Sequence, residues 1–97
     1  MAHYVMLLKF TDQGIRNVKD TTKRAAAAAD MAAKMGAKLG TAYWTMGQYD
    51  LVLIADAPDD ETIAAVSVKL GSLGNVSIQT LRAFTASEVD GILKKVG

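Results

Sequence analysis

HYVMLLKF (residues 3–10) and YDLVLIADA (residues 49–57) are the two stretches of sequence that decide the fold of this chain. Each is short, apolar and without helical spacing, so each is predicted to be a β-strand. Because strand side chains alternate between the two faces of a sheet, both stretches place apolar side chains on both faces. A sheet with one face in water alternates apolar with polar residues instead. We therefore expect two central strands in a sheet that is covered on both sides.

The remaining sequence supplies two more strands and three helices around this pair. Strands are predicted at Lys38–Thr45 and Asn75–Phe84. Helices are predicted from a cap at Thr21 or Thr22 to about Met35, after Pro58 up to Gly71, and from Thr85 onward. The polar segment Thr11–Asp20 is predicted to be a loop with at most one helical turn. The order β-α-β-β-α-β-α predicts one α+β domain over residues 1–97, a ferredoxin-like βαββαβ sandwich with a short C-terminal helix. Its antiparallel sheet has the strand order 4-1-3-2, with both long helices on one face.

Helical spacing indicates which side of each long helix faces the sheet. The stripe in the first helix consists of Ala25, Ala28, Ala29, Ala32 and Met35. The stripe in the second helix consists of Ile63, Val66, Ser67 and Leu70. Thr85-Ala86-Ser87-Glu88 matches a capping box, which predicts the start of the C-terminal helix.

The second face of the sheet also needs a cover, because each exposed Val, Leu or Ile forfeits roughly 1.5–3 kcal/mol of burial. One cover is a second copy of the chain, packed sheet against sheet in a homodimer, or a higher oligomer built from it. The alternative is that the short C-terminal helix folds back over the open face.

The composition argues against several classes of binding partner and cofactor. Eleven Lys and Arg against ten Asp and Glu give a net charge of +1, which argues against nucleic acid or an anionic membrane surface as the main partner. With no cysteine and one histidine, neither a cysteine-ligated metal site nor one with several histidines is predicted, and no cofactor is predicted. The N-terminal residues lack the features of a secretory signal, so we expect a cytoplasmic protein.

Three segments resemble the GYD-domain family: KFTDQGIRNVKD (residues 9–20), YWTMGQYD (residues 43–50) and GSLGNV (residues 71–76). The signature that gives the family its name corresponds here to Gly47-Gln48-Tyr49-Asp50. The resemblance covers nearly the whole chain. It implies a dimeric α+β barrel of the ferredoxin-like group, common in bacteria and of uncharacterised function. The wider group holds cofactor-free monooxygenases, small isomerase-like enzymes and non-catalytic binding proteins, and fold kinship does not choose among them.

The predicted topology gathers the candidate site residues at one end of the sheet. The end of the first strand, the hairpin and the loop before the last strand meet there, and the loop into the first long helix begins there. The candidates for ligand binding are Lys9, Arg16, Asn17, Trp44, Gly47 and Asn75, and the candidates for catalysis are Asp50 and Tyr49. His3, Asp56 and Arg82 fall at the opposite end, where Arg82 is predicted to pair with Asp56.

Each candidate also has a purely structural interpretation. Asp50 is a general base if an apolar surrounding raises its pKa, or it accepts backbone hydrogen bonds and fixes the hairpin. Tyr49 orients a substrate or fills the dimer seam. Arg16 and Asn17 bind an anionic group, or they lie in a solvated loop that caps the helix.

Two functions remain open from the sequence. The first is a cofactor-independent enzyme, similar to an oxygenase or an isomerase, that binds a small apolar or aromatic molecule and acts on it. The alternative is a non-catalytic ligand-binding, regulatory or stress dimer. RNA binding through the sheet ranks below both, because the net charge is close to zero.

Overall fold

The computed structural model describes residues 1–97 and contains four strands, four α-helices and one 3₁₀ turn. The elements are β1 (Ala2–Phe10), α1 (Asp12–Arg16), η1 (Val18–Asp20), α2 (Thr21–Lys34), β2 (Lys38–Trp44), β3 (Leu51–Ala57), α3 (Asp60–Ser72), β4 (Val76–Ala83) and α4 (Ala86–Leu93). None of these helices has the length and apolar character needed to cross a membrane.

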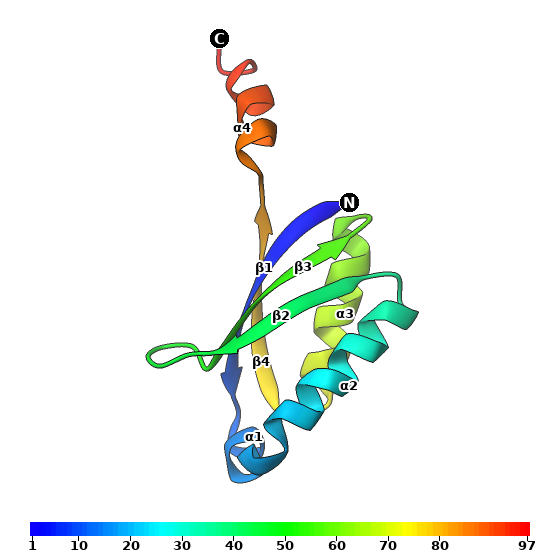
Figure 1. Ribbon diagram of the computed structural model, residues 1–97, viewed down its shortest axis with the longest axis vertical. Helices are drawn as coiled ribbons and strands as arrows, with labels where there is room; N and C mark the ends of the chain where they lie inside the picture. The colour runs from blue at the N-terminus through cyan, green and yellow to red at the C-terminus, as the bar shows by residue number, and fades with distance from the viewer.

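The strands form one antiparallel sheet in the order β2-β3-β1-β4, which is the predicted order read from the other edge. The central strands β1 and β3 pair in a register that sets Leu8 opposite Leu51 and Val5 opposite Ile54. Helices α2 and α3 both cover the same face of this sheet (Figure 1). The predicted ferredoxin-like architecture is therefore confirmed.

The hydrophobic core lies between that face and the two helices. Its buried members are Tyr4, Met6, Leu8, Ala32, Ala37, Leu51, Leu53, Ala55, Ala57, Ile63, Val66 and Leu70. In α3 the predicted stripe is confirmed, since three of its four residues are in this core and the fourth, Ser67, hydrogen-bonds to the Thr80 hydroxyl at 2.8 Å. In α2, however, only Ala32 is fully buried, and the alanines toward the N-terminus are half-buried or exposed.

The starts of α3 and α4 are capped by side chains. Asp59 caps α3 by accepting the Thr62 N–H at 2.8 Å, and Thr85 with Glu88 forms the predicted capping box of α4. The prediction that Thr21 or Thr22 caps α2 is wrong. Helix α2 follows the η1 turn with Asp20 at its cap position, so Thr21 already lies inside the helix.

The hairpin between β2 and β3 is longer than predicted. Tyr49 and Asp50 lie in the loop and not in β3, because Thr45 closes the loop around them. Its backbone N–H donates to the Asp50 carbonyl at 2.8 Å, and its hydroxyl donates to the Tyr49 carbonyl at 2.6 Å. Gly47 adopts a φ of 110° at the tip, as its place in the predicted turn required.

The face of the sheet opposite the helices is apolar and uncovered within the chain. We call it the open face; its apolar residues are Val5, Leu7, Tyr43, Val52, Ile54 and Leu81. Ile54, at the centre of this face, is 52% exposed. Helix α4 does not fold back over it, so that alternative is wrong: α4 continues beyond β4 and projects away from the sheet (Figure 1).

Gly14 lies where helix α1 packs closely against the loop between α3 and β4. It is buried in α1, and a Cβ at this position would lie 1.9 Å from the Asn75 carbonyl oxygen. The α1 segment therefore rests directly on the backbone of the loop between α3 and β4, which holds the two connections together.

We predict that Gly14→Ala lowers the free energy of unfolding by about 1–3 kcal/mol or more, because the methyl group overlaps backbone that cannot move independently. Gly71→Ala is the matched control, since a Cβ at Gly71 meets nothing within 4 Å and the residue lies in α3. It is expected to leave stability unchanged or to raise it by about 0.4–1 kcal/mol. Urea unfolding of both variants measures the difference, and equal stabilities would contradict the prediction.

Candidate functional site

The sequence segments predicted to converge do meet at one end of the sheet. The Thr11 N–H donates to the Asn75 carbonyl at 3.1 Å, and the Thr11 hydroxyl donates to the Gly74 carbonyl at 2.5 Å. Gln13 Nε2 donates to Asn75 Oδ1 at 3.0 Å. The end of β1, helix α1 and the loop before β4 are therefore one hydrogen-bonded unit.

Asp50 is tied to the end of β1 by two hydrogen bonds. Its Oδ2 accepts the Phe10 N–H at 2.8 Å, and its own N–H donates to the Leu8 carbonyl at 2.8 Å. One carboxylate oxygen is therefore already used in holding the hairpin against β1. This geometry favours the structural interpretation of Asp50.

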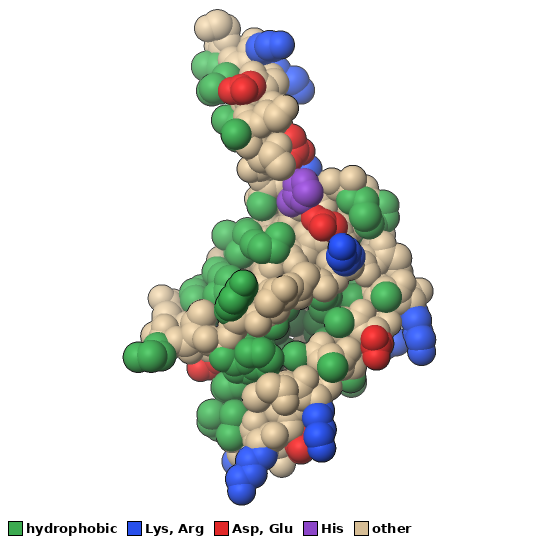
Figure 2. All heavy atoms as spheres, in the orientation of Figure 1, with side chains coloured by type: hydrophobic (Ala, Val, Ile, Leu, Met, Phe, Trp, Pro, Cys, Tyr) green, Lys and Arg blue, Asp and Glu red, His purple; other side chains and the backbone are tan.

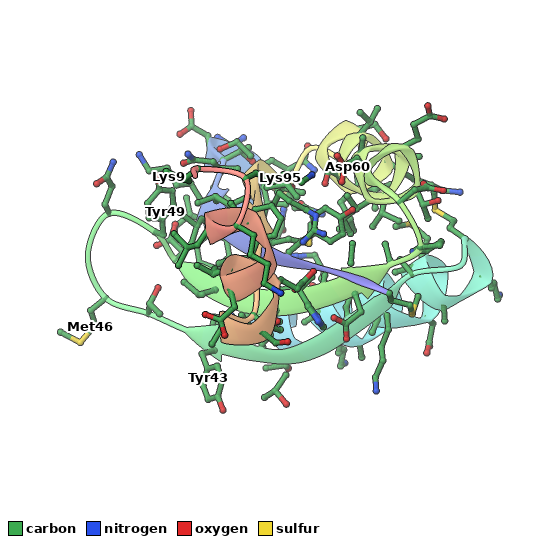
Figure 3. All side chains as sticks on the ribbon, turned by 90° about the horizontal axis from the view of Figure 1, so that it is seen from above. Lys9, Tyr43, Met46, Tyr49, Asp60 and Lys95 are labelled. Atoms are coloured by element: carbon green, nitrogen blue, oxygen red, sulfur yellow. The ribbon has the colours of Figure 1, made fainter.

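Tyr49 lies on the open face with Lys9 and Gln79. Its hydroxyl donates to Gln79 Oε1 at 2.6 Å, and Lys9 Nζ lies 5.7 Å from the centre of its ring (Figure 3). These side chains border a shallow depression of about 190 Å³. Asp50 does not line it, so the two residues proposed for catalysis do not share a cavity.

Four of the predicted ligand-binding residues line neither this depression nor the larger cavity described below: Arg16, Asn17, Trp44 and Gly47. Arg16 and Asn17 are exposed and line neither cavity, and Asn17 Nδ2 donates to the Gln13 carbonyl at 3.0 Å. Trp44 Nε1 donates to Thr21 Oγ1 at 3.0 Å, on the helix side of the sheet. Gly47 lies at the tip of the hairpin loop beside Met46, which is 99% exposed and points away from the body (Figure 3).

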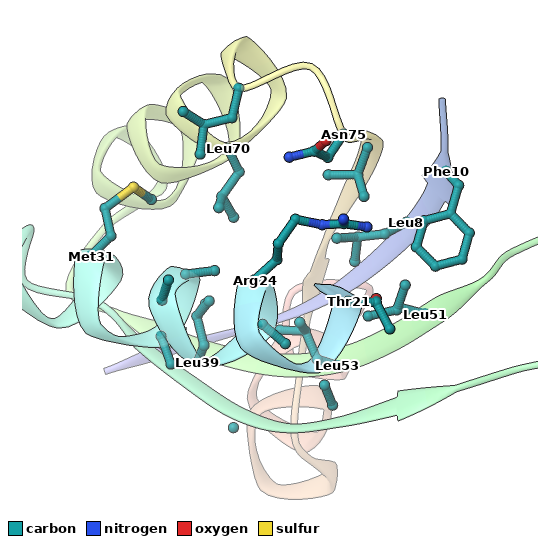
Figure 4. A pocket seen from close by; sticks show the side chains of 18 residues that line it. Leu8, Phe10, Thr21, Arg24, Met31, Leu39, Leu51, Leu53, Leu70 and Asn75 are labelled. Atoms are coloured by element: carbon teal, nitrogen blue, oxygen red, sulfur yellow. The ribbon is translucent and has the colours of Figure 1, made fainter. Parts of the chain in front are cut away.

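The larger cavity lies on the helix side, between α2, α3 and the sheet. It has a volume of about 340 Å³ and walls that are almost entirely apolar (Figure 4). Its polar side chains are those of Thr21, Arg24 and Asn75. Of the predicted site residues, Asn75 alone lines it.

This cavity and its charged residue, Arg24, were not predicted from the sequence. Arg24 Nη1 donates to the Asn17 carbonyl at 2.6 Å, and Nη2 donates to the Gly14 carbonyl at 3.2 Å. The sequence feature that indicates the cavity is the run of alanines after Arg24. Methyl groups at positions that face the sheet leave space that longer side chains would fill.

The opposite end of the sheet carries a cluster of charged residues around Arg82. Arg82 pairs with Asp60 at 3.9 Å and Glu88 at 3.7 Å, while Asp56 bonds to His3 Nδ1 at 2.5 Å. The predicted Arg82–Asp56 pair is therefore wrong, because His3 lies directly opposite Asp56 in the sheet register and Arg82 does not.

Tyr4 extends this cluster into the core. Its hydroxyl donates to Asp60 Oδ1 at 2.6 Å. Burial and this hydrogen bond to a carboxylate raise the pKa of Tyr4 to about 12. A phenol that stays protonated and bonded in this way fixes the start of α3 to β1, which is a structural role.

These features define a small ferredoxin-like α+β domain with one apolar face left open and a cavity under its helices. The chain belongs to the GYD domain family, whose model matches residues 4–93. The family suggested by the three sequence segments is thus confirmed.

One relative and two solved structures are similar to this chain. A Thermus thermophilus protein named "Glutamine synthetase and cystathionine beta-lyase binding protein" is 27% identical over 95 residues, which cover 97% of this chain and 100% of that protein. The crystal structure of TTHA0845 from Thermus thermophilus has a TM-score of 0.58 and 25% identity, covering 89% of this chain and 96% of that one. The crystal structure of FFRP-DM1 has a TM-score of 0.61 and 17% identity, covering 87% and 100%, and shares the fold.

We predict that Asp50→Ala lowers the free energy of unfolding by about 1–3 kcal/mol, because the half-buried Phe10 N–H loses its acceptor. Asp50→Asn retains an oxygen acceptor and is expected to lose less. Asp30→Ala, on the exposed side of α2, serves as the control and should stay within about 0.5 kcal/mol of the native protein. If Asp50→Ala unfolds at the native urea midpoint, the carboxylate has no structural role and is free for chemistry.

Proposed function

We propose that this protein is a homodimeric, non-catalytic binding protein that associates with an enzyme. The observation that carries the proposal is the uncovered open face. Burial of that face against a second copy removes its aliphatic side chains from water, at roughly 1.5–3 kcal/mol for each side chain fully covered. The contact is symmetrical, since each copy offers the same surface to the other.

The accessible surface of the single chain supports a second copy as the occupant. A folded monomer of 10.3 kDa has an accessible surface of roughly 5,400 Å². This chain has 6311 Å². The excess, roughly 900 Å², is close to the ~800 Å² that each partner buries in a standard protein–protein interface.

Helix α4 supports the same arrangement. Val89, Ile92 and Leu93 are between 39% and 58% exposed, and the helix projects beyond the sheet with none of its residues in the buried core (Figure 1). A helix with an exposed apolar stripe needs a surface to pack on. In a dimer built on the open faces, α4 of each copy lies against the other copy.

Association with an enzyme is supported by the relative whose printed name describes it as a binding protein for two enzymes. The geometry of the site agrees with a binding role, because Asp50 is held by Phe10 and Tyr49 is held by Gln79. The other function predicted from the sequence, a cofactor-independent enzyme, has Asp50 and Tyr49 as its catalytic candidates, and these two residues do not line a common cavity. The cytoplasmic location stays a prediction.

We predict that the protein sediments at twice the chain mass of 10.3 kDa and that Ile54→Lys sediments at the chain mass. The lysine would place an unpaired charge at the centre of the interface, where desolvation is costly. Val68→Lys is the matched control, since Val68 is 72% exposed on α3 and its variant should remain a dimer. A native protein that sediments at 10.3 kDa would overturn the dimer.

We also predict a complex with glutamine synthetase or cystathionine beta-lyase from the organism that encodes this chain, the two enzymes in the relative's name. Each purified enzyme is mixed with the protein at micromolar concentration and followed by analytical ultracentrifugation. Co-sedimentation with at least one is the expected result. Independent sedimentation of both mixtures would refute the enzyme-binding role, while the dimer would stand on its own measurement. Ile54→Lys, run in parallel, reports whether the enzyme binds the dimer or the single chain.

A further inference from the structure

We propose that the cavity between α2, α3 and the sheet binds a small molecule with an apolar tail and a carboxylate head, with Arg24 receiving the carboxylate. This goes beyond the proposed protein-binding function, because it assigns a separate small-molecule site to the helix side of the domain. The proposal rests on the shape of the cavity, the composition of its walls and the unpaired donors at its rim.

The cavity exists because α2 faces the sheet with methyl groups. Ala32 is fully buried where the C-terminal half of α2 meets the sheet, but Ala25 and Ala28 are only half-buried. Along this N-terminal half, the space that longer side chains would occupy is left open, and it forms the hollow beside α2 in Figure 2. Close packing is the rule in protein interiors, so a space of about 340 Å³ is large for a domain of 97 residues.

The walls of the cavity suit a hydrocarbon or aromatic tail. Of the 18 lining residues, 14 are hydrophobic. They include Leu8 and Phe10 from β1, Leu51 and Leu53 from β3, and Leu70 from α3. Volumes of about 300–1,000 Å³ with mostly apolar walls and a few polar groups are typical of small-molecule sites. At ~30 Å³ for each water-sized group, this cavity accommodates roughly eleven non-hydrogen atoms.

The polar groups at the rim are donors without acidic partners. Arg24 uses two N–H groups on backbone carbonyls, which leaves three of its five donors unpaired. It forms no ion pair, and no Asp or Glu lines the cavity. The Asn75 side chain accepts a hydrogen bond from Gln13 through Oδ1, so its NH₂ group remains free to donate.

This arrangement selects a carboxylate over a neutral or cationic head group. The planar guanidinium fork matches the two oxygens of a carboxylate, and charge-assisted hydrogen bonds are roughly twice as strong as neutral ones. The bonds to Gly14 and Asn17 hold the guanidinium in place, so it is already positioned before a ligand arrives. Figure 4 shows the Arg24 side chain reaching from α2 to a position between Asn75 and Thr21, with apolar side chains around them.

The test compares octanoate with 1-octanol, which has the same tail and no charge. Isothermal titration calorimetry on the native protein is expected to show octanoate binding at least about tenfold more tightly than 1-octanol, from charge-assisted hydrogen bonds to Arg24. Equal affinities, or no binding of octanoate, would overturn the proposal.

Two pairs of variants locate the binding. Ala28→Leu places three more carbon atoms in the cavity and is expected to weaken binding of both probes about tenfold or more, whereas Ala26→Leu, on an exposed part of the same helix, should bind as the native protein does. Arg24→Gln is expected to weaken octanoate about tenfold or more and to leave 1-octanol unchanged, and Arg24→Lys should retain part of the difference. Native octanoate affinity in a folded Ala28→Leu or Arg24→Gln variant would refute the site.

Asn75→Asp provides a further test if removal of Arg24 unfolds the protein. The variant keeps the oxygen that accepts from Gln13 and places a negative charge at the rim, so octanoate should weaken about tenfold or more while 1-octanol is unaffected. Circular dichroism confirms that each variant is folded. Ile54→Lys, which alters the opposite face, should still bind octanoate more tightly than 1-octanol, so failure of the dimer and failure of this site are observed separately.

Discussion

The antiparallel pairing of β1 with β3 sets Leu8 opposite Leu51 on one face of the sheet and Val5 opposite Ile54 on the other. The rest of the domain depends on this pair of strands, which is apolar on both faces of the sheet, because the two helices cover only one of those faces. On the covered face the pair forms the centre of the core together with Met6 and Leu53. On the open face the same strands leave apolar side chains whose burial requires a second molecule. The fold of the single chain and the proposed dimer therefore have a common origin.

The strands and the inward side of each helix were predictable from the sequence because they depend on local periodicity, and the strand order followed from the βαββαβ order of elements. Alternation along β1 and β3 and the spacing of Ile63, Val66 and Leu70 in α3 are properties of short stretches. Chain topology then placed Thr11 near Asn75 without any knowledge of side-chain packing. These elements agree with the structure to within about two residues at their ends, which is the ordinary uncertainty of element boundaries.

The distance of α2 from the sheet and the direction in which α4 leaves it were not predictable from periodicity. Periodicity shows which side of α2 faces the sheet, but not how far the helix stands from it. That distance depends on the methyl groups of Ala25 and Ala28 and on the η1 turn that feeds the helix. The capping box of Thr85 and Glu88 showed where α4 begins, but a cap carries no information about the surface on which a helix packs. The role of Asp50 likewise depended on whether the Phe10 N–H lay within reach, which is a tertiary contact.

The two proposed surfaces are physically adjacent although they lie on opposite faces. Leu8, Leu51 and Leu53 line the cavity under the helices, while Leu7, Val52 and Ile54 lie on the open face. These residues alternate along the same two strands, so each side chain that lines the proposed ligand site is next in sequence to one on the proposed dimer face. Packed interiors transmit small displacements because they contain little free space. A ligand that fills the space under α2 and a partner that packs on the open face therefore act on one shared pair of strands. Any coupling between them must be reciprocal, with each stabilising or opposing the other by the same free energy.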